Sequence, residues 1–158
     1  MGKNKLMDRI KFALNILKSP RAEFLKIDRI TLDYLLGNYI VLLIISAVLS
    51  GIVTFILGVV RALYYNIFSH AEIDFTGVLN YSIGIGVSLM FFLIFCGTII
   101  LFFFSILLKS ILRLPYIKIL KILMYAAMPL LLFGWIPNIV YSLVVWSTFL
   151  LFIGLKEN

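Results

Sequence analysis

The sequence predicts an all-α protein: a polytopic transmembrane helical bundle of four spans with an N-terminal amphipathic interfacial arm. Composition is the first observation, because 63% of the 158 residues are apolar and only 13% are charged, unlike a water-soluble domain. The second is that long stretches contain no Asp, Glu, Lys, Arg or His. A backbone in lipid must satisfy its own hydrogen bonds, so such stretches form helices. These stretches are Tyr39–Val60, Val78–Leu108, Ile122–Phe133 and Ile136–Leu155.

Residues 1–30 are predicted to form the arm. Leu6, Ile10, Leu14 and Leu17 fall on one stripe of a helix over residues 3–18. Ser19 is a favoured N-cap residue and Pro20 a favoured first helical residue, so a second short helix is expected to start there. Two placements remain open at this point: the apolar stripe lies on the inner leaflet, or it packs on the helical bundle.

Positive charge is concentrated in this arm, which holds eight of the fourteen Lys and Arg residues in a chain of net charge +7. The cations alternate with Leu, Ile and Phe, a pattern that suits an anionic lipid surface and argues against nucleic acid as the partner. We therefore expect the arm to contact the anionic inner leaflet or a protein partner. The cations predicted to do so are Lys11, Lys18, Arg21, Lys26 and Arg29.

Residues 31–158 are predicted to form the four-span transmembrane domain. Small residues on the first two spans are spaced for close helix contact, which in lipid depends on the close approach of backbones. Ser46 and Ser50, and Gly51 and Gly58, lie on the first span. Two overlapping pairs lie on the second span, and all four members are expected to pack against a helix: Ser82, Gly84, Gly86 and Ser88.

The last two spans are predicted to form a short hairpin. A helix over Ile122–Phe133 reaches about 18 Å, which is less than the roughly 30 Å of a hydrocarbon core. Extension back to Ile117 lengthens it, and a hairpin that crosses the membrane fully is favoured over a re-entrant one. Pro129 is expected to bend the third span, and Trp135 is placed at the outer interface.

The distribution of Lys and Arg between the loops predicts the orientation. Basic residues gather on the cytoplasmic side of membrane proteins. The arm and the Lys109–Lys121 segment are rich in Lys and Arg, whereas Ala62–Gly77 and the turn at Trp135 contain none. The N-terminus and the C-terminus are therefore both expected on the cytoplasmic side of the cell membrane.

The sequence shows no pattern typical of catalysis, of a cofactor site or of a metal site. Cys96 is the only cysteine and His70 the only histidine, so a metal site built from these two side chains is not expected. His70 lies near Glu72 and Asp74 in a loop that we interpret as solvated. The uncharged spans also lack the ionisable residues that mark most proton and ion pathways.

Three segments, in this order, resemble the prokaryotic members of the Yip-domain family of multi-pass membrane proteins. The first is Pro-x3-Phe-x2-Ile at Pro20, Phe24 and Ile27; the second is a Tyr-x3-Pro-Leu core in the third span; the third is a Trp-x3-Leu-x3-Gly-Leu close near the end of the chain. The second and third segments contain Tyr125, Pro129, Trp146 and Gly154.

The family is named for proteins that interact with Rab-type GTPases, so the resemblance implies an interaction or membrane-organising role and implies no reaction. Members of the family usually have five spans, whereas four are predicted here. The expected function is therefore that of a non-enzymatic membrane scaffold or adaptor with the bilayer, a protein partner or a second copy as its partner. The alternative is a small oligomeric channel or transporter.

Overall fold

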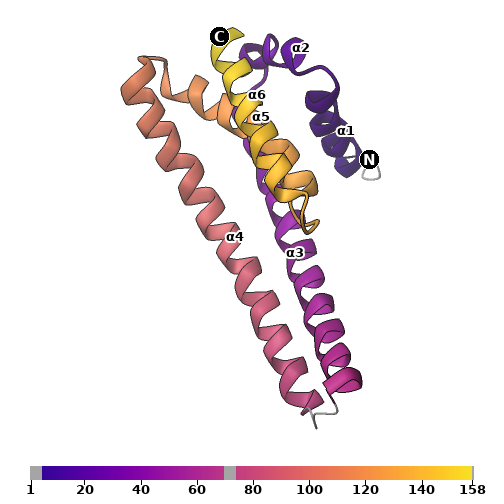
Figure 1. The fold of residues 1–158 in the computed structure, drawn as a ribbon. Coiled ribbons are helices and arrows are strands. Elements are labelled where there is room, and N and C mark those ends of the chain that lie inside the picture. Colours follow the sequence, from indigo (N-terminus) through magenta and orange to yellow (C-terminus); the bar gives the residue numbers. More distant parts are fainter. Residues whose placement is uncertain (1–4, 70–73, 158) are drawn as a thin grey trace.

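The computed structural model describes residues 5–69 and 74–157, and every regular element in these ranges is helical. The arm forms α1 and α2, followed by a short 3-10 helix, η1. Two long helices, α3 and α4, follow, and then two shorter ones, α5 and α6 (Figure 1). The bounds are α1 Lys5–Lys18, α2 Pro20–Phe24, η1 Ile27–Arg29, α3 Leu32–Ser69, α4 Phe75–Leu112, α5 Tyr116–Phe133 and α6 Val140–Glu157.

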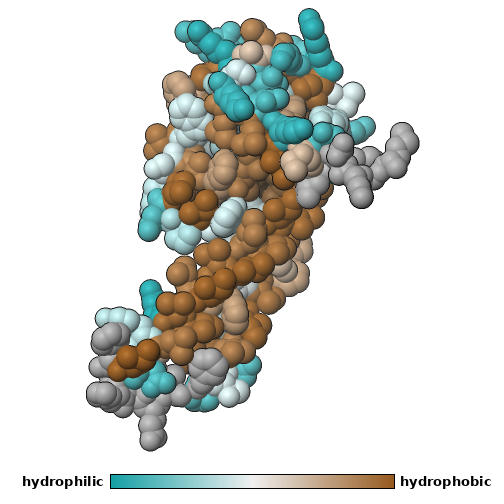
Figure 2. Space-filling view, turned by 90° about the vertical axis from the view of Figure 1, so that its right-hand side faces the viewer, coloured by the Kyte–Doolittle hydropathy of each residue, from teal (hydrophilic) through white to brown (hydrophobic). Residues whose placement is uncertain are grey.

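Four of these helices are long and apolar enough to cross a membrane, which confirms the predicted all-α polytopic fold. The candidate spans are Leu32–Ile67, Thr76–Leu112, Tyr116–Phe133 and Val140–Glu157. The first two candidate spans extend beyond their uncharged stretches at both ends, because a helix continues through the interface where charged residues are tolerated. Figure 2 shows the result as an apolar band between two polar ends.

Helices α3 and α4 run antiparallel and touch through small residues, as predicted for part of the small-residue pattern. A Cβ atom added to Gly86 would lie 2.8 Å from the carbonyl oxygen of Gly51, and one added to Gly51 would lie 2.9 Å from that of Gly86. Further along the pair, Gly58 lies against Ser82. These contacts bring the two backbones together, which is the geometry that small residues permit in lipid.

The expectation that Gly84 and Ser88 also pack against a helix is corrected by the structure. Gly84 has no neighbouring heavy atom within 4 Å of an added Cβ, and Ser88 is exposed. The physical reason is helical periodicity: at about 3.6 residues per turn, positions two apart lie on nearly opposite sides of a helix. Ser82 and Gly86 face α3, so Gly84 and Ser88 face away from it.

Helices α5 and α6 form the predicted hairpin, which lies beside the first half of α3 (Figure 1). Among the described residues, most of the fully buried side chains belong to α5, to the arm and to the start of α3, so the core lies at the end of the bundle that holds the arm and the end of α6. Pro129 is inside α5, which continues past it to Phe133.

The arm folds onto this core. Ala13, Ile16, Phe24 and Ile27 are fully buried in the same cluster as residues of α3, α5 and α6. Of the two placements predicted for the arm, the structure favours packing on the bundle. The expected second helix starts at Pro20, but the hydroxyl of Ser19 donates to the Asn15 carbonyl oxygen at 3.4 Å and does not cap α2.

Candidate functional site at the junction of the arm and the hairpin

An aromatic cluster centred on Tyr125 joins the arm to α5. The Tyr125 ring is fully buried, and its centroid lies 5.4 Å from that of Phe12 and 5.5 Å from that of Phe24. Phe12 also packs edge-on against Tyr34 at the start of α3, with centroids 5.7 Å apart. Pairs at these separations contribute stability beyond the burial of apolar area. One residue of α5 therefore fixes both helices of the arm.

Gly154 brings α6 to the same junction. A Cβ atom added to Gly154 would lie 2.6 Å from Phe24 Cε1 and 2.7 Å from Ile122 Cγ2. The phenyl ring of Phe24 therefore fills the space that any larger residue at position 154 would need. Helix α2 rests on α6 at this point because position 154 has no side chain.

The structure brings most of the family-like motif residues to one place. Phe24, Ile27 and Tyr125 are fully buried in the core cluster, and Gly154 contacts Phe24. Trp146 lies apart from this place on α6, where it is 38% exposed and packs against Phe149 with ring centroids 5.4 Å apart. Pro129 is buried inside α5 and Pro20 is half-buried at the start of α2, and neither belongs to the core cluster.

Polar contacts connect the arm to the start of α5 and to the end of α6. Arg21 Nε lies 2.9 Å from Glu157 Oε1, and Lys118 Nζ lies 3.3 Å from Asp28 Oδ2. Lys121 Nζ donates to the carbonyl oxygen of Ile30 at 2.6 Å. These contacts place the arm, the start of α5 and the end of α6 at one end of the molecule.

Several of these partners were not identified in the sequence. Arg9 donates from Nη1 to the Gly37 carbonyl oxygen at 2.9 Å, which fastens α1 to α3. The sequence identified Lys121 only as one of the loop cations, yet its ammonium group donates to the carbonyl oxygens of Ile27 and Ile30 at the two ends of η1. A surface charge paired with a residue close by in space but distant in the chain leaves no local signal.

The five predicted arm cations separate into two groups. Arg21 pairs with Glu157, and Lys26 Nζ lies 2.9 Å from Glu23 Oε1 within the arm. Lys11, Lys18 and Arg29 are exposed and form no ion pair with any of the residues that the structure describes. We call Lys11, Lys18 and Arg29 the free arm cations.

We expect the pair of Arg21 and Glu157 to contribute only about 0–1 kcal/mol to the free energy of unfolding, because the Arg21 side chain is 71% exposed. A double-mutant cycle with Arg21→Gln and Glu157→Gln measures this coupling. A coupling energy of several kcal/mol would contradict the assignment of docking to the aromatic cluster.

A cavity of about 430 Å³ lies below the junction, between α3, α4, α5 and α6. None of its lining residues is charged, and all of its polar side chains carry hydroxyl groups. The Tyr39 hydroxyl donates to the Gly97 carbonyl oxygen at 3.2 Å. Such a lining suits acyl chains better than hydrated ions, so it does not favour the alternative of a channel. The hydroxyl-bearing side chains are Tyr39, Ser46, Ser50, Ser147 and Thr148.

A scan against protein families matches this chain to the Yip1 domain over residues 14–158. The match begins in α1, two residues after Phe12, and includes Phe24, Tyr125, Gly154 and all four candidate spans. The chain belongs to the Yip1-domain family. Searches of curated proteins and of solved structures find no match.

Membership of the Yip1-domain family identifies the chain as a multi-pass membrane protein. The Yip1-domain family is not a known enzyme family. His70 and Glu72, which we considered together with Asp74 as a possible polar cluster, lie outside the described residues.

Proposed function

We propose that this protein is a non-enzymatic membrane scaffold whose folded arm presents a cationic surface to the anionic leaflet of the cell membrane. The observation behind this proposal is the separation of roles within the arm. Ala13, Ile16, Phe24 and Ile27 are buried against the bundle, while the free arm cations remain exposed and unpaired among the described residues. A helix fastened in this way holds its cations at a fixed place instead of inserting its apolar face into lipid.

We further propose that both termini are cytoplasmic. The arm, the segment from Lys109 to Lys121 and the end of α6 gather at one end of the molecule, where they concentrate the basic residues. The positive-inside rule places such an end in the cytoplasm. The anionic lipids of the inner leaflet are then the nearest partner of opposite charge. A protein partner with an acidic surface would contact the same cations.

The proposal is tested with the protein in phosphatidylcholine nanodiscs, mixed with vesicles that contain phosphatidylglycerol. A variant with Lys11→Gln, Lys18→Gln and Arg29→Gln should bind these vesicles on the order of a hundredfold more weakly, since each cation near an anionic surface contributes about 1 kcal/mol. Binding should also weaken as salt concentration rises.

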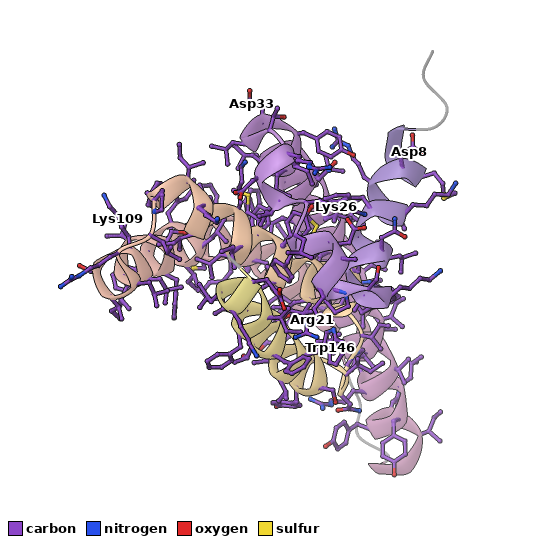
Figure 3. The ribbon with its side chains drawn as sticks, turned by 90° about the horizontal axis from the view of Figure 1, so that it is seen from above. Asp8, Arg21, Lys26, Asp33, Lys109 and Trp146 are labelled. Carbon is purple, nitrogen blue, oxygen red and sulfur yellow. The ribbon has the colours of Figure 1, made fainter. Side chains whose placement is uncertain are left out.

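The matched control removes cations that lie at the same end of the molecule but apart from the arm, with Lys109→Gln and Arg113→Gln at the C-terminal end of α4. Lys109 lies well away from Arg21 and Lys26 when the molecule is seen from above (Figure 3). The control should retain most of the binding. Equal binding by the triple variant and the wild-type protein would contradict the proposal, as would equal recruitment of neutral vesicles.

A further inference from the structure

The α5–α6 hairpin is shorter than the α3–α4 pair and ends beside the middle of α3. Gly134, at the hairpin turn, lines the same cavity as Ser50 of α3. Helix α3 then continues to Ser69 with α4 as its neighbour, and neither α5 nor α6 accompanies this part (Figure 1). The grooves along this part are lined only by residues of α3 and α4.

The uncharged stretch of α3 indicates where the membrane lies. The uncharged stretch Tyr39–Val60 rises about 33 Å, which matches a hydrocarbon core of roughly 30 Å. Beyond Ser50, α3 exposes apolar side chains that suit contact with lipid, among them Ile52, Ile56 and Val60. The hydrocarbon core therefore extends to about Val60, and Ser50 lies near its midplane. The turn at Gly134, which lies at the level of Ser50, is then within the membrane as well.

Several hydrogen-bond donors of the turn are paired with carbonyl oxygens of the turn and of the end of α5. The indole Nε1 of Trp135 donates to the Leu132 carbonyl oxygen at 2.7 Å, so this donor needs no water. The backbone N–H of Gly134 donates to the carbonyl oxygen of Leu130, and that of Ile136 donates to the carbonyl oxygen of Phe133. Pro137 has no N–H group that would need a partner. A turn at membrane depth requires this internal pairing, because lipid offers no partners.

We propose that α5 and α6 form a re-entrant hairpin, which enters the membrane from the face that holds the arm and turns back near the midplane. One leaflet then contains four helices and the other contains two. The larger cross-section in the leaflet next to the arm favours membrane that is convex on that side, so the protein is a wedge suited to curved bilayers. This inference requires neither the free arm cations nor the assignment of the termini to the cytoplasm.

The depth of Trp135 tests the placement directly. A Trp146→Phe variant leaves Trp135 as the only tryptophan, because the chain has two. In bilayers that carry bromine at defined acyl positions, its fluorescence should be quenched most strongly by the deepest bromines. Strongest quenching by bromines near the headgroups would overturn the proposal, because Trp135 would then lie at an interface.

A labelling experiment gives an independent result on a Cys96→Ala background. Ile139→Cys, next to the turn, should resist a membrane-impermeant maleimide from both faces of the membrane and react once detergent is added. Asp74→Cys, before α4, should react from one face without detergent. Labelling of Ile139→Cys from the same face as Asp74→Cys would show that the hairpin crosses the membrane fully.

A third measurement places a charge at the turn by a substitution that is compatible with the local backbone conformation. Asn138 has a φ of 69°, a left-handed conformation that Asn, Asp and Gly adopt most readily. Asn138→Asp should lower the ratio of folded to unfolded protein on the order of a hundredfold in bilayers, because it places a charge at membrane depth. Asn138→Gly should have little effect. Equal stability of the Asp and Gly variants would contradict the re-entrant placement.

The wedge is tested by sorting between membranes. Reconstituted protein that can exchange between small and large vesicles of one lipid composition should become enriched in the small ones, with the arm on the outer surface. An equal density of protein in small and large vesicles would overturn the wedge. It would leave the placement of the hairpin turn, which the depth of Trp135 tests, unaffected.

Discussion

Phe24→Ala should lower the free energy of unfolding by about 3–5 kcal/mol, the usual cost of removing a buried aromatic side chain. Phe24 is fully buried, packs on Tyr125 and lies within 2.6 Å of the position that a Cβ of Gly154 would take. Its loss opens a cavity at the point where α2, α5 and α6 meet. The measurement is reversible unfolding in mixed micelles, together with the rate of proteolysis within the arm, which should rise.

The control is Leu25→Ala, which alters the next residue along the chain. Leu25 is 63% exposed, so its truncation should change the free energy of unfolding by less than about 0.5 kcal/mol. If both variants have the same small effect, the arm is not fastened to the hairpin by Phe24.

Gly86→Leu should separate α3 from α4 and cost at least about 1–3 kcal/mol, as overpacking of a close contact does. The added side chain would meet the backbone carbonyl of Gly51, which has no rotamer with which to move away. The free energy of unfolding of the α3–α4 pair in bilayers measures this cost.

Gly84→Leu is the matched control, because it makes the same substitution two residues away on the lipid-facing side of α4. Nothing lies within 4 Å of an added Cβ at Gly84, so this variant should remain as stable as the wild-type protein. A large loss of stability in Gly84→Leu, but not in Gly86→Leu, would reverse the assignment of the contact face.

The sequence was sufficient for the fold class and for the approximate position of each span, since absence of charge over a bilayer's length has few structural alternatives. It was not sufficient to decide which small residues touch. Ser82 and Gly86 form one pair and Gly84 and Ser88 another, and both have the same spacing. Only the direction of the partner helix distinguishes them.

The position of the arm required the structure for a similar reason. An amphipathic stripe shows that one face is to be covered, but lipid and protein cover it equally well. The contacts that decide the matter are distant in the chain: Arg21 and Glu157 are 136 residues apart. The motif residues Phe24, Tyr125 and Gly154 were recognised as a pattern, whereas their meeting at one junction was not predicted.

The measurement that tests the account most directly is a cross-link between the arm and the end of α6. Cysteines replace Arg21 and Glu157 in a Cys96→Ala background, with Arg21 and Lys109 as the distant control pair. In both neutral and anionic nanodiscs, a short thiol cross-linker should join the first pair and leave the control pair unlinked. Failure to link positions 21 and 157 in anionic nanodiscs would show that the arm lies on the lipid instead of on the bundle.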